Sequence, residues 1–267
     1  MDTFEKDYTK LTQKDIQLWE SVKLKEEMKI DGKLIARKNL FREYPKAVRH
    51  YLTLFPNNYL DIEELKKEEE LSNLVQLFIQ KVEDKTSNES MLLKYIKDNK
   101  AYFIIGSILK SYYSFGHHDS FIFPEFQLGN TYQVDYLLVG KNSDGFHFVF
   151  VELEHPNSST TIKTGHLGEA FRKGLNQVTD WEVWLETFYS SLRESFQKKL
   201  NPSNSLPPEF YDFDPTRLHY VVVAGRREDF NETTRKLRRK KQTERITILH
   251  YDNLIDSAEN IIGESNY

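Results

Sequence analysis

The fold is decided by residues 131–156, TYQVDYLLVGKNSDGFHFVFVELEHP, whose two apolar halves flank a polar segment and therefore predict a β-hairpin. Side chains alternate between the two faces of a strand. The second strand thus presents Phe146, Phe148, Phe150, Glu152 and Glu154 on one face and His147, Val149, Val151 and Leu153 on the other. Because both faces are largely apolar, we expect this strand to lie in the middle of a sheet.

Three carboxylates are expected to meet where the second strand ends. If the polar residues 140–145 form the loop, Asp135 on the first strand lies opposite Phe150 and diagonal to Glu152. Glu154 follows Glu152 on the same face. The hairpin therefore brings Asp135, Glu152 and Glu154 together at the end of a buried strand.

Carboxylates gathered in a buried place indicate a metal site. Each unpaired buried carboxylate costs several kcal/mol, and mutual repulsion would protonate one of them unless a cation is present. A hard divalent ion with oxygen ligands resolves this conflict, and we expect Mg²⁺, with Mn²⁺ as a substitute. The alternative is a strand end that emerges into solvent, where Glu152 and Glu154 are hydrated or paired with Arg or Lys.

The composition is typical of a folded protein without disulfides. The chain has 267 residues and a mass of 31.7 kDa, 13% of its residues are aromatic, and it has no cysteine. Thiolate metal sites and a cysteine nucleophile are therefore excluded. The first residues are charged, and no apolar run approaches the roughly 18 residues of a membrane span. We expect a cytoplasmic protein with no membrane partner.

Positive charge is concentrated in residues 226–245, although the whole chain has a formal net charge of -4. This segment has nine Lys or Arg against four Asp or Glu, which is typical either of a phosphate-binding surface or of a solvated helix face. Arg226 and Arg227 follow a buried strand, where they either clamp a phosphate or pair with a carboxylate. The candidate DNA contacts are Arg226, Arg227, Arg238, Arg239 and Lys240.

Residues 1–85 are highly charged and helix-like, so we expect an N-terminal helical region. Thr12 with Asp15 makes a capping box for the first helix. A second helix is expected to begin at Asp61 and to bury an apolar stripe along one side.

The expected domain boundary is the break at residues 84–87, which gives a second domain over residues 86–267. Directly after it, Thr86 with Glu89 makes another capping box, and this local role accounts for Glu89. His117 and His118 lie further on in a polar loop without a compelling ligand spacing, so we expect them to be solvated.

Strands and helices alternate in the second domain. Apolar stretches predict further strands at residues 121–128, 218–224 and 246–250, with a long helix after Pro156 and a basic helix before the last strand. An antiparallel hairpin followed by such alternation indicates an α/β fold with an α+β-like mixed sheet flanked by helices.

An Asp in one strand, an acidic-x-ionisable pair at the end of the next and a following helix resemble the PD-(D/E)XK nuclease superfamily. More specifically, residues 125–254 are similar to the nuclease domain of the Shedu anti-phage defence family. The matching segments, in order, are QVDYLL, VELEHP, LNQVTDWEVWL, YVVVAGRR and ILHYDNLI. The resemblance implies a restriction-endonuclease-like core and metal-dependent DNA endonuclease activity in bacterial defence. It also implies homo-oligomers, and a regulatory N-terminal region that senses a phage-derived trigger.

Residue by residue, the resemblance gives Asp135 the place of the superfamily Asp and Glu152 that of the following acidic ligand. The backbone carbonyl of Leu153 would complete the protein's share of the metal ligands. Glu154 departs from the superfamily pattern, because a Lys that orients or activates the attacking water is usual there.

Two functions follow from these residues. In a nuclease, Glu154 serves as general base or as ligand of a second metal, Lys173 supplies the missing positive charge, and Gln177 orients a ligand or phosphate. A helix-surface Gln is, however, more often inert. The alternative function is a catalytically inactive nuclease-fold protein that binds DNA or a partner, in which Glu154 marks a decayed site.

Overall fold

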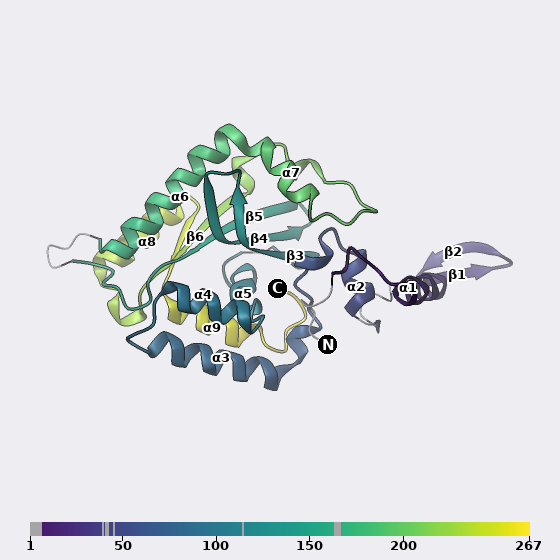
Figure 1. The fold of residues 1–267 in the computed structure, drawn as a ribbon, viewed down its shortest axis with the longest axis horizontal. Coiled ribbons are helices and arrows are strands. Elements are labelled where there is room, and N and C mark those ends of the chain that lie inside the picture. Colours follow the sequence, from purple (N-terminus) through teal and green to yellow (C-terminus); the bar gives the residue numbers. More distant parts are fainter. Residues whose placement is uncertain (1–6, 39, 41–42, 45, 114, 163–166) are drawn as a thin grey trace.

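The computed structural model describes residues 7–38, 40, 43–44, 46–113, 115–162 and 167–267. Within these residues, five strands form one sheet in the order β3-β4-β5-β6-β7 (Figure 1). They are β3 (Asp119–Leu128), β4 (Tyr132–Asn142), β5 (Gly145–Leu153), β6 (Leu218–Val223) and β7 (Ile246–Leu249). The first three pair antiparallel and the last three pair parallel. The predicted mixed sheet is confirmed, with β5 at its centre.

Helices cover both faces of this sheet, as the alternation of elements predicted. One face packs against α6 (Glu169–Phe188), α7 (Leu192–Gln197) and α8 (Glu232–Gln242), and the other against α3 (Glu68–Glu83), α4 (Glu89–Asp98), α5 (Phe103–Tyr112) and α9 (Tyr251–Ile261). Figure 1 shows α3, α4 and α9 below the sheet and α6 and α7 above it. Each face has its own apolar core, so β5 is buried on both sides.

The register of the central hairpin differs from the predicted one by two residues. Val139 pairs with Phe148, and Asn142 pairs with Gly145, so the strands continue through the polar residues to a two-residue turn. The Asn142 side chain closes this turn by accepting a hydrogen bond from the Asp144 backbone N–H at 2.9 Å. A shift of two residues preserves which side chains share a face. The predicted faces therefore hold, while the predicted opposition of Asp135 to Phe150 is wrong.

The N-terminal region contains α1 (Gln13–Glu26) and α2 (Lys46–Leu52), and the predicted capping box of Thr12 and Asp15 is present. Between the helices lies a hairpin that was not predicted from the sequence, formed by β1 (Glu27–Ile30) and β2 (Lys33–Arg37). Its turn is Asp31-Gly32, with positive φ at both residues, and Asp-Gly between apolar runs is a hairpin signal. The hairpin extends away from the main body (Figure 1).

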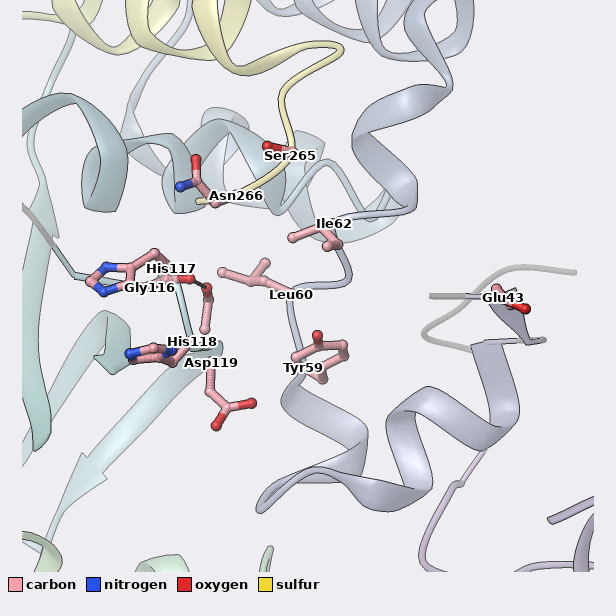
Figure 2. Close-up of a pocket in the computed structure, with 11 residues that line it drawn as sticks. Glu43, Tyr59, Leu60, Ile62, Gly116, His117, His118, Asp119, Ser265 and Asn266 are labelled. Carbon is pink, nitrogen blue, oxygen red and sulfur yellow. Dashed lines mark hydrogen bonds between the residues drawn. The ribbon is translucent and has the colours of Figure 1, made fainter. Parts of the chain in front are cut away.

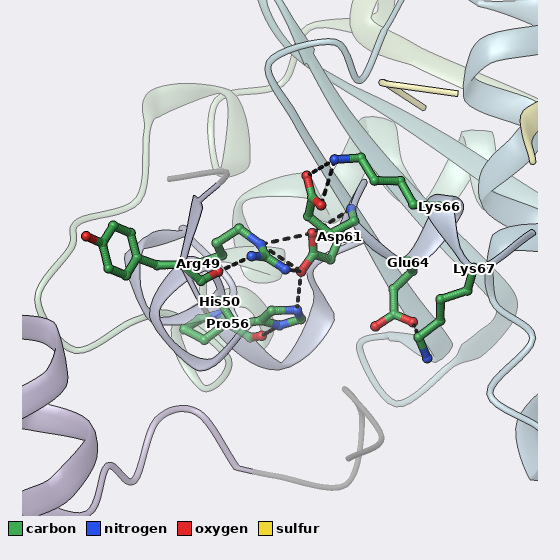
Figure 3. Close-up of polar contacts among 9 residues, drawn as sticks. Arg49, His50, Pro56, Asp61, Glu64, Lys66 and Lys67 are labelled. Atoms are coloured by element: carbon green, nitrogen blue, oxygen red, sulfur yellow. Dashed lines mark hydrogen bonds and ion pairs between the residues drawn. The ribbon is translucent and has the colours of Figure 1, made fainter. Parts of the chain in front are cut away.

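Asp61 does not begin a helix, because its carboxylate is bound by Arg49. The Arg49 guanidinium donates to both Asp61 oxygens at 2.8–3.2 Å, and both side chains are buried (Figure 3). His50 lies beside this pair, with its Nδ1 2.7 Å from the carbonyl oxygen of Pro56. Short 3-10 turns at Pro56–Asn58 and Glu64–Lys66 follow, so α3 begins only at Glu68. The buried pair joins α2 to the segment that leads into α3.

The expected boundary at residues 84–87 falls between α3 and α4. Helix α3 nevertheless packs against α9, and Phe78 lies in the same apolar core as residues of the sheet. The division into residues 1–85 and 86–267 stays a prediction. None of the described helices is both long and apolar enough to span a membrane.

Candidate active site

Two carboxylates lie at the carboxyl end of the central strand. Glu152 pairs with Val222 of β6, and the backbone N–H of Glu154 donates to the Val223 carbonyl at 2.8 Å. Glu152 is 3% exposed and Glu154 is 2% exposed. The parallel pairing with β6 therefore holds both residues below the protein surface, so the strand end does not emerge into solvent. The pairing of Glu154 with a Lys, which the same alternative allowed, is present, because Lys173 lies 3.1 Å from it.

Asp135 reaches the same place from β4. The ladder between β4 and β5 ends where Tyr136 pairs with Val151. One step further, Asp135 Oδ2 accepts a hydrogen bond from the Leu153 backbone N–H at 2.8 Å, in place of a backbone partner. The N–H and C=O of one strand residue point to the same side. The Leu153 carbonyl therefore also points toward the opening beside Asp135.

The neighbouring edge strand is irregular at the same level. Glu125 has φ +51°, a conformation that is unusual for a non-glycine residue, and it interrupts the pairing of β3 with β4 opposite Asp135. Phe123 and Phe126 consequently bury their rings in the same core although they are three residues apart.

Lys173 joins Glu154 to Glu89, an acidic residue that was not predicted to lie in the site. The Lys173 ammonium lies 3.1 Å from Glu154 Oε2 and 3.3 Å from Glu89 Oε2. The predicted capping box of Thr86 and Glu89 is wrong, because Asn88 is the N-cap of α4. Glu89 is the first residue of α4, and its side chain is free to reach the site. An Asn directly before this Glu was the signal that could have revealed it.

Helix α6 sits unusually close to the strand end. A Cβ added at Gly174 would lie 2.6 Å from Val222 Cγ1 and 3.2 Å from Glu154 Cγ, so only glycine permits this approach. The neighbouring Lys173 is thereby placed over Glu154. Gln177, one turn along the same side of α6, has a buried Oε1 without a hydrogen-bond partner in the described part of the chain.

Burial and mutual repulsion make all three carboxyl groups poor acids. Burial, reinforced by Asp135 and Glu154, raises the pKa of Glu152 to about 9. Burial raises the pKa of Asp135 to about 7, although the hydrogen bond from the Leu153 N–H lowers it. Burial likewise raises the pKa of Glu154 to about 7, although Lys173 lowers it. Burial alone would lower the pKa of Lys173, but Glu154 and Glu89 outweigh it, and that pKa is raised.

The donor set fits one hard cation with few protein ligands. Glu152 Oε2 and Glu154 Oε1 are buried and lack a hydrogen-bond partner within the described residues. The same residues contain no group of three His, Asp or Glu side chains arranged to hold a metal ion. Two carboxylates with a backbone carbonyl and waters do suit Mg²⁺, which keeps much of its hydration. Asp135, Glu152 and the Leu153 carbonyl are the groups that would hold it.

The two arginines after β6 pair with carboxylates. The Arg226 guanidinium donates to both oxygens of Asp252, at 2.8 and 3.1 Å, and Arg227 pairs with Asp256. Of the two alternatives left open by the sequence, the structure shows the carboxylate pairing. This pairing fastens the loop after β6 to α9.

The basic part of α8 lies away from the carboxylates. Because β6 and β7 are parallel, α8 runs from the carboxyl end of β6 back to the amino end of β7. Its last turn, which contains Arg239 and Lys240, is therefore at the opposite end of the sheet from Glu154. Arg238 is half-buried there, whereas Arg239 and Lys240 are exposed. Any DNA contact of these residues is made at a distance from the candidate site.

A separate cavity of about 370 Å³ lies between the segment before α3 and the start of β3 (Figure 2). Its lining includes Tyr59, Leu60 and Asp119 together with His117 and His118, which are exposed as expected. None of the candidate active-site residues lines it.

The fold and the site define a mixed α/β protein with a desolvated acidic site at the carboxyl end of its central strand. The family described as "Shedu protein SduA, C-terminal" matches residues 85–255, which is more than half of the chain. The chain therefore belongs to the Shedu family, as its motifs predicted, and this membership links it to anti-phage defence. No curated protein matches the chain.

Proposed function

We propose that this protein is a Mg²⁺-dependent DNA endonuclease that hydrolyses phosphodiester bonds in defence against phage. The observation that carries the proposal is the buried Glu152 at the end of β5, which lies close enough to Asp135 and Glu154 for both carboxyl groups to raise its pKa. Such a cluster is unfavourable without a cation, and its environment favours neutralisation of all three groups. The family's link to defence supports a nucleic acid as the substrate.

Asp135, Glu152 and the Leu153 carbonyl would hold the metal, with Mn²⁺ as a substitute for Mg²⁺. When bound, the ion supplies hydroxide near neutral pH and stabilises the charge that develops on the phosphate. The Leu153 N–H fixes the orientation of the Asp135 carboxylate by its 2.8 Å hydrogen bond. The metal ligands are thus positioned by the strand backbone.

Glu154 is the proposed general base. A pKa of about 7 suits proton transfer at neutral pH, and Lys173 holds the Glu154 carboxylate at 3.1 Å. The same ammonium provides a positive charge in the site, which the superfamily usually takes from a Lys at the position of Glu154. Glu89, at 3.3 Å, fixes Lys173 from the other side. Gln177, with its unpartnered buried oxygen, would orient water or phosphate.

A second candidate function is a catalytically inactive nuclease-fold protein that binds DNA or a partner. It is favoured by Glu154 in place of Lys, and by the lack of three clustered metal-binding side chains among the described residues. For either function we expect homo-oligomers and an N-terminal region that responds to a phage-derived trigger.

The decisive experiment is incubation of the purified protein with supercoiled and linear DNA in Mg²⁺, in Mn²⁺ and in EDTA. We expect cleavage only with metal, and a loss of at least about 100-fold in Asp135→Ala and Glu152→Ala. The exposed Asp144→Ala, in the turn of the same hairpin, is the matched control and should cut normally. DNA binding without cleavage, and without heat of Mg²⁺ binding in calorimetry, would instead establish the inactive protein.

A further inference from the structure

A groove of about 480 Å³ leads to Asp135 from the side of α4. On one side it is lined by Leu93, Lys94 and Lys97 of α4, and on the other by Pro124, Asp135 and Tyr136 of the sheet. We call this the α4 groove. It lies on the side of β4 away from β5, next to the unpaired position of Glu125 in β3, so the candidate metal ligand Asp135 is shared between the groove and the candidate site.

The two lysines of the α4 groove differ in their partners. They are three residues apart on α4, and both therefore line the same side of the groove. The Lys97 ammonium is held at 2.7 Å by the carboxylate of Glu125. Lys94 is exposed and has no ion pair or hydrogen bond in the described part of the chain. Asp98, one turn along α4 from Lys94, also lines the groove. Of the two lysines, Lys94 is nevertheless the one whose ammonium is available to an anionic ligand.

The other walls of the groove combine apolar and polar residues. Leu93 and Pro124 contribute hydrocarbon surface, whereas Ser90, Asp98, Glu125 and Gln133 contribute polar groups, and Tyr136 is almost fully buried. Apolar surface beside a cation suits an unpaired nucleotide, whose base and sugar pack against that surface while its phosphate is neutralised. The volume is that of a site for one small molecule, and a DNA duplex does not enter such a space.

We propose that the α4 groove holds one unpaired nucleotide of the DNA strand, next to the phosphate that is cut at Asp135, with the Lys94 ammonium on a phosphate of that strand. The inference rests on the proposed nuclease function and makes the substrate a strand that is locally unpaired at the cut. A solvated lysine on a helix face is the competing explanation, and it predicts no specific effect of Lys94.

The first test measures binding of a labelled single-stranded oligonucleotide in EDTA, by fluorescence anisotropy over a range of salt. We expect Lys94→Ala to weaken binding about tenfold at low salt and to reduce the salt slope by about 0.7, the value for one phosphate contact on a single strand. Lys199→Ala is the matched control, because Lys199 is also exposed and lies after α7. Equal effects of both substitutions, or no effect of Lys94→Ala, overturn the proposal.

The second test uses the absence of native cysteine. Lys94→Cys and Lys199→Cys each introduce one thiol, and oligonucleotides with a thiol-reactive group on one phosphate are offered as a single strand or as a blunt duplex. We expect disulfide capture of the single strand by Lys94→Cys only. Capture of the duplex at the same rate overturns the requirement for an unpaired nucleotide.

Neither test depends on DNA cleavage. The nuclease function and the nucleotide site in the α4 groove can therefore be rejected independently of each other. If residue 94 captures the single strand specifically but the protein never cuts DNA, the proposed nuclease function is wrong and nucleotide binding in the α4 groove still stands. If the protein cuts DNA with metal but Lys94→Ala binds the single strand as the wild type does, the nuclease function stands and nucleotide binding in the α4 groove is wrong.

Discussion

Glu154 and Lys173 form the ion pair on which the proposed chemistry depends. In the PD-(D/E)XK superfamily, which the sequence motifs resemble, a Lys usually occupies the position of Glu154, whereas here the ammonium comes from α6 and lies 3.1 Å from the carboxylate. The two chemical groups of the pair are retained, but their order along the chain is different. Activity should therefore depend on the pair and not on either residue alone.

For this pair we predict that Glu154→Ala lowers metal-dependent cleavage about 100-fold, because a positioned base contributes about 10²–10⁴-fold. Glu154→Lys should also be poor, since it places two ammonium groups side by side. The exchange Glu154→Lys with Lys173→Glu should recover more activity than either single change, which is measured as a double-mutant cycle on single-turnover cleavage. Normal turnover in Glu154→Ala would make this residue a bystander.

Glu152 makes the stability of the metal-free protein depend on pH. Its pKa rises from the ordinary value of 4.5 to about 9 on folding, so between these values the folded chain holds a proton that the unfolded chain has released. The free energy of unfolding therefore falls as pH rises through this window, by at most about 1.4 kcal/mol per pH unit for one proton. Asp135 and Glu154 act in the same direction up to about pH 7.

We predict that Glu152→Gln in EDTA loses less stability than the wild type between about pH 5 and about pH 8. The measurement is urea denaturation at both pH values, and the exposed Glu186→Gln on α6 is the control, with the wild-type slope. Equal losses of stability in wild type and Glu152→Gln would show that Glu152 is ionised at neutral pH without metal.

At the scale of elements, the contact of α6 with β5 and β6 positions the Glu154–Lys173 ion pair. Gly174 allows the helix backbone to approach Val222 and Glu154. We predict that Gly174→Ala destabilises the protein by about 1–3 kcal/mol, in spite of the higher helix propensity of Ala, because the added methyl overpacks a rigid contact. Chemical denaturation measures this change. The control is Asn176→Ala, at an exposed position of the same helix, which should be neutral or stabilising. If Gly174→Ala is as stable as the wild type, α6 can shift to accommodate the added methyl group.

The order of elements could be predicted from the sequence, because the apolar alternation of β5 and the run of β6 depend only on local pattern. The hairpin register could not, since polar residues 140–142 look like a loop but continue the strands. Three carboxylates were still placed together, because an error of two residues leaves the faces unchanged. Glu89 was missed because a local capping pattern offered a sufficient explanation. Only the tertiary fold, which brings the start of α4 within reach of Lys173, reveals the contact.

At the scale of the whole molecule, the basic residues proposed to contact DNA lie in two separate places. Lys173 and Lys94 lie near the carboxylates, whereas the basic turn of α8 is at the other end of the sheet. DNA binding and the proposed hydrolysis can therefore be altered by separate substitutions.

The N-terminal β1–β2 hairpin has an apolar surface, with Met28, Ile30 and Leu34 about half exposed or more.

We predict that neutralising Arg238, Arg239 and Lys240 together weakens duplex binding and reduces its salt slope by about one for each phosphate that these side chains neutralise. The cleavage rate at saturating DNA should not change, because these residues are distant from Glu154. Anisotropy titrations at several salt concentrations and single-turnover assays measure the two effects. An unaltered salt slope would mean that the basic turn faces solvent or another subunit.

The parallel pairing of β5 with β6 also sets the order in which the chain assembles. The β4–β5 hairpin is local and can form early, whereas β6 begins only at Leu218, after the whole of α6 and α7. Until β6 docks, Glu152 and Glu154 remain hydrated at a strand end and keep their ordinary acidity. The desolvation that creates the site therefore falls on a late step of folding. A nascent chain carries the carboxylates before β6 has been made, so we expect the proposed hydrolytic activity to appear only after β6 has docked against β5.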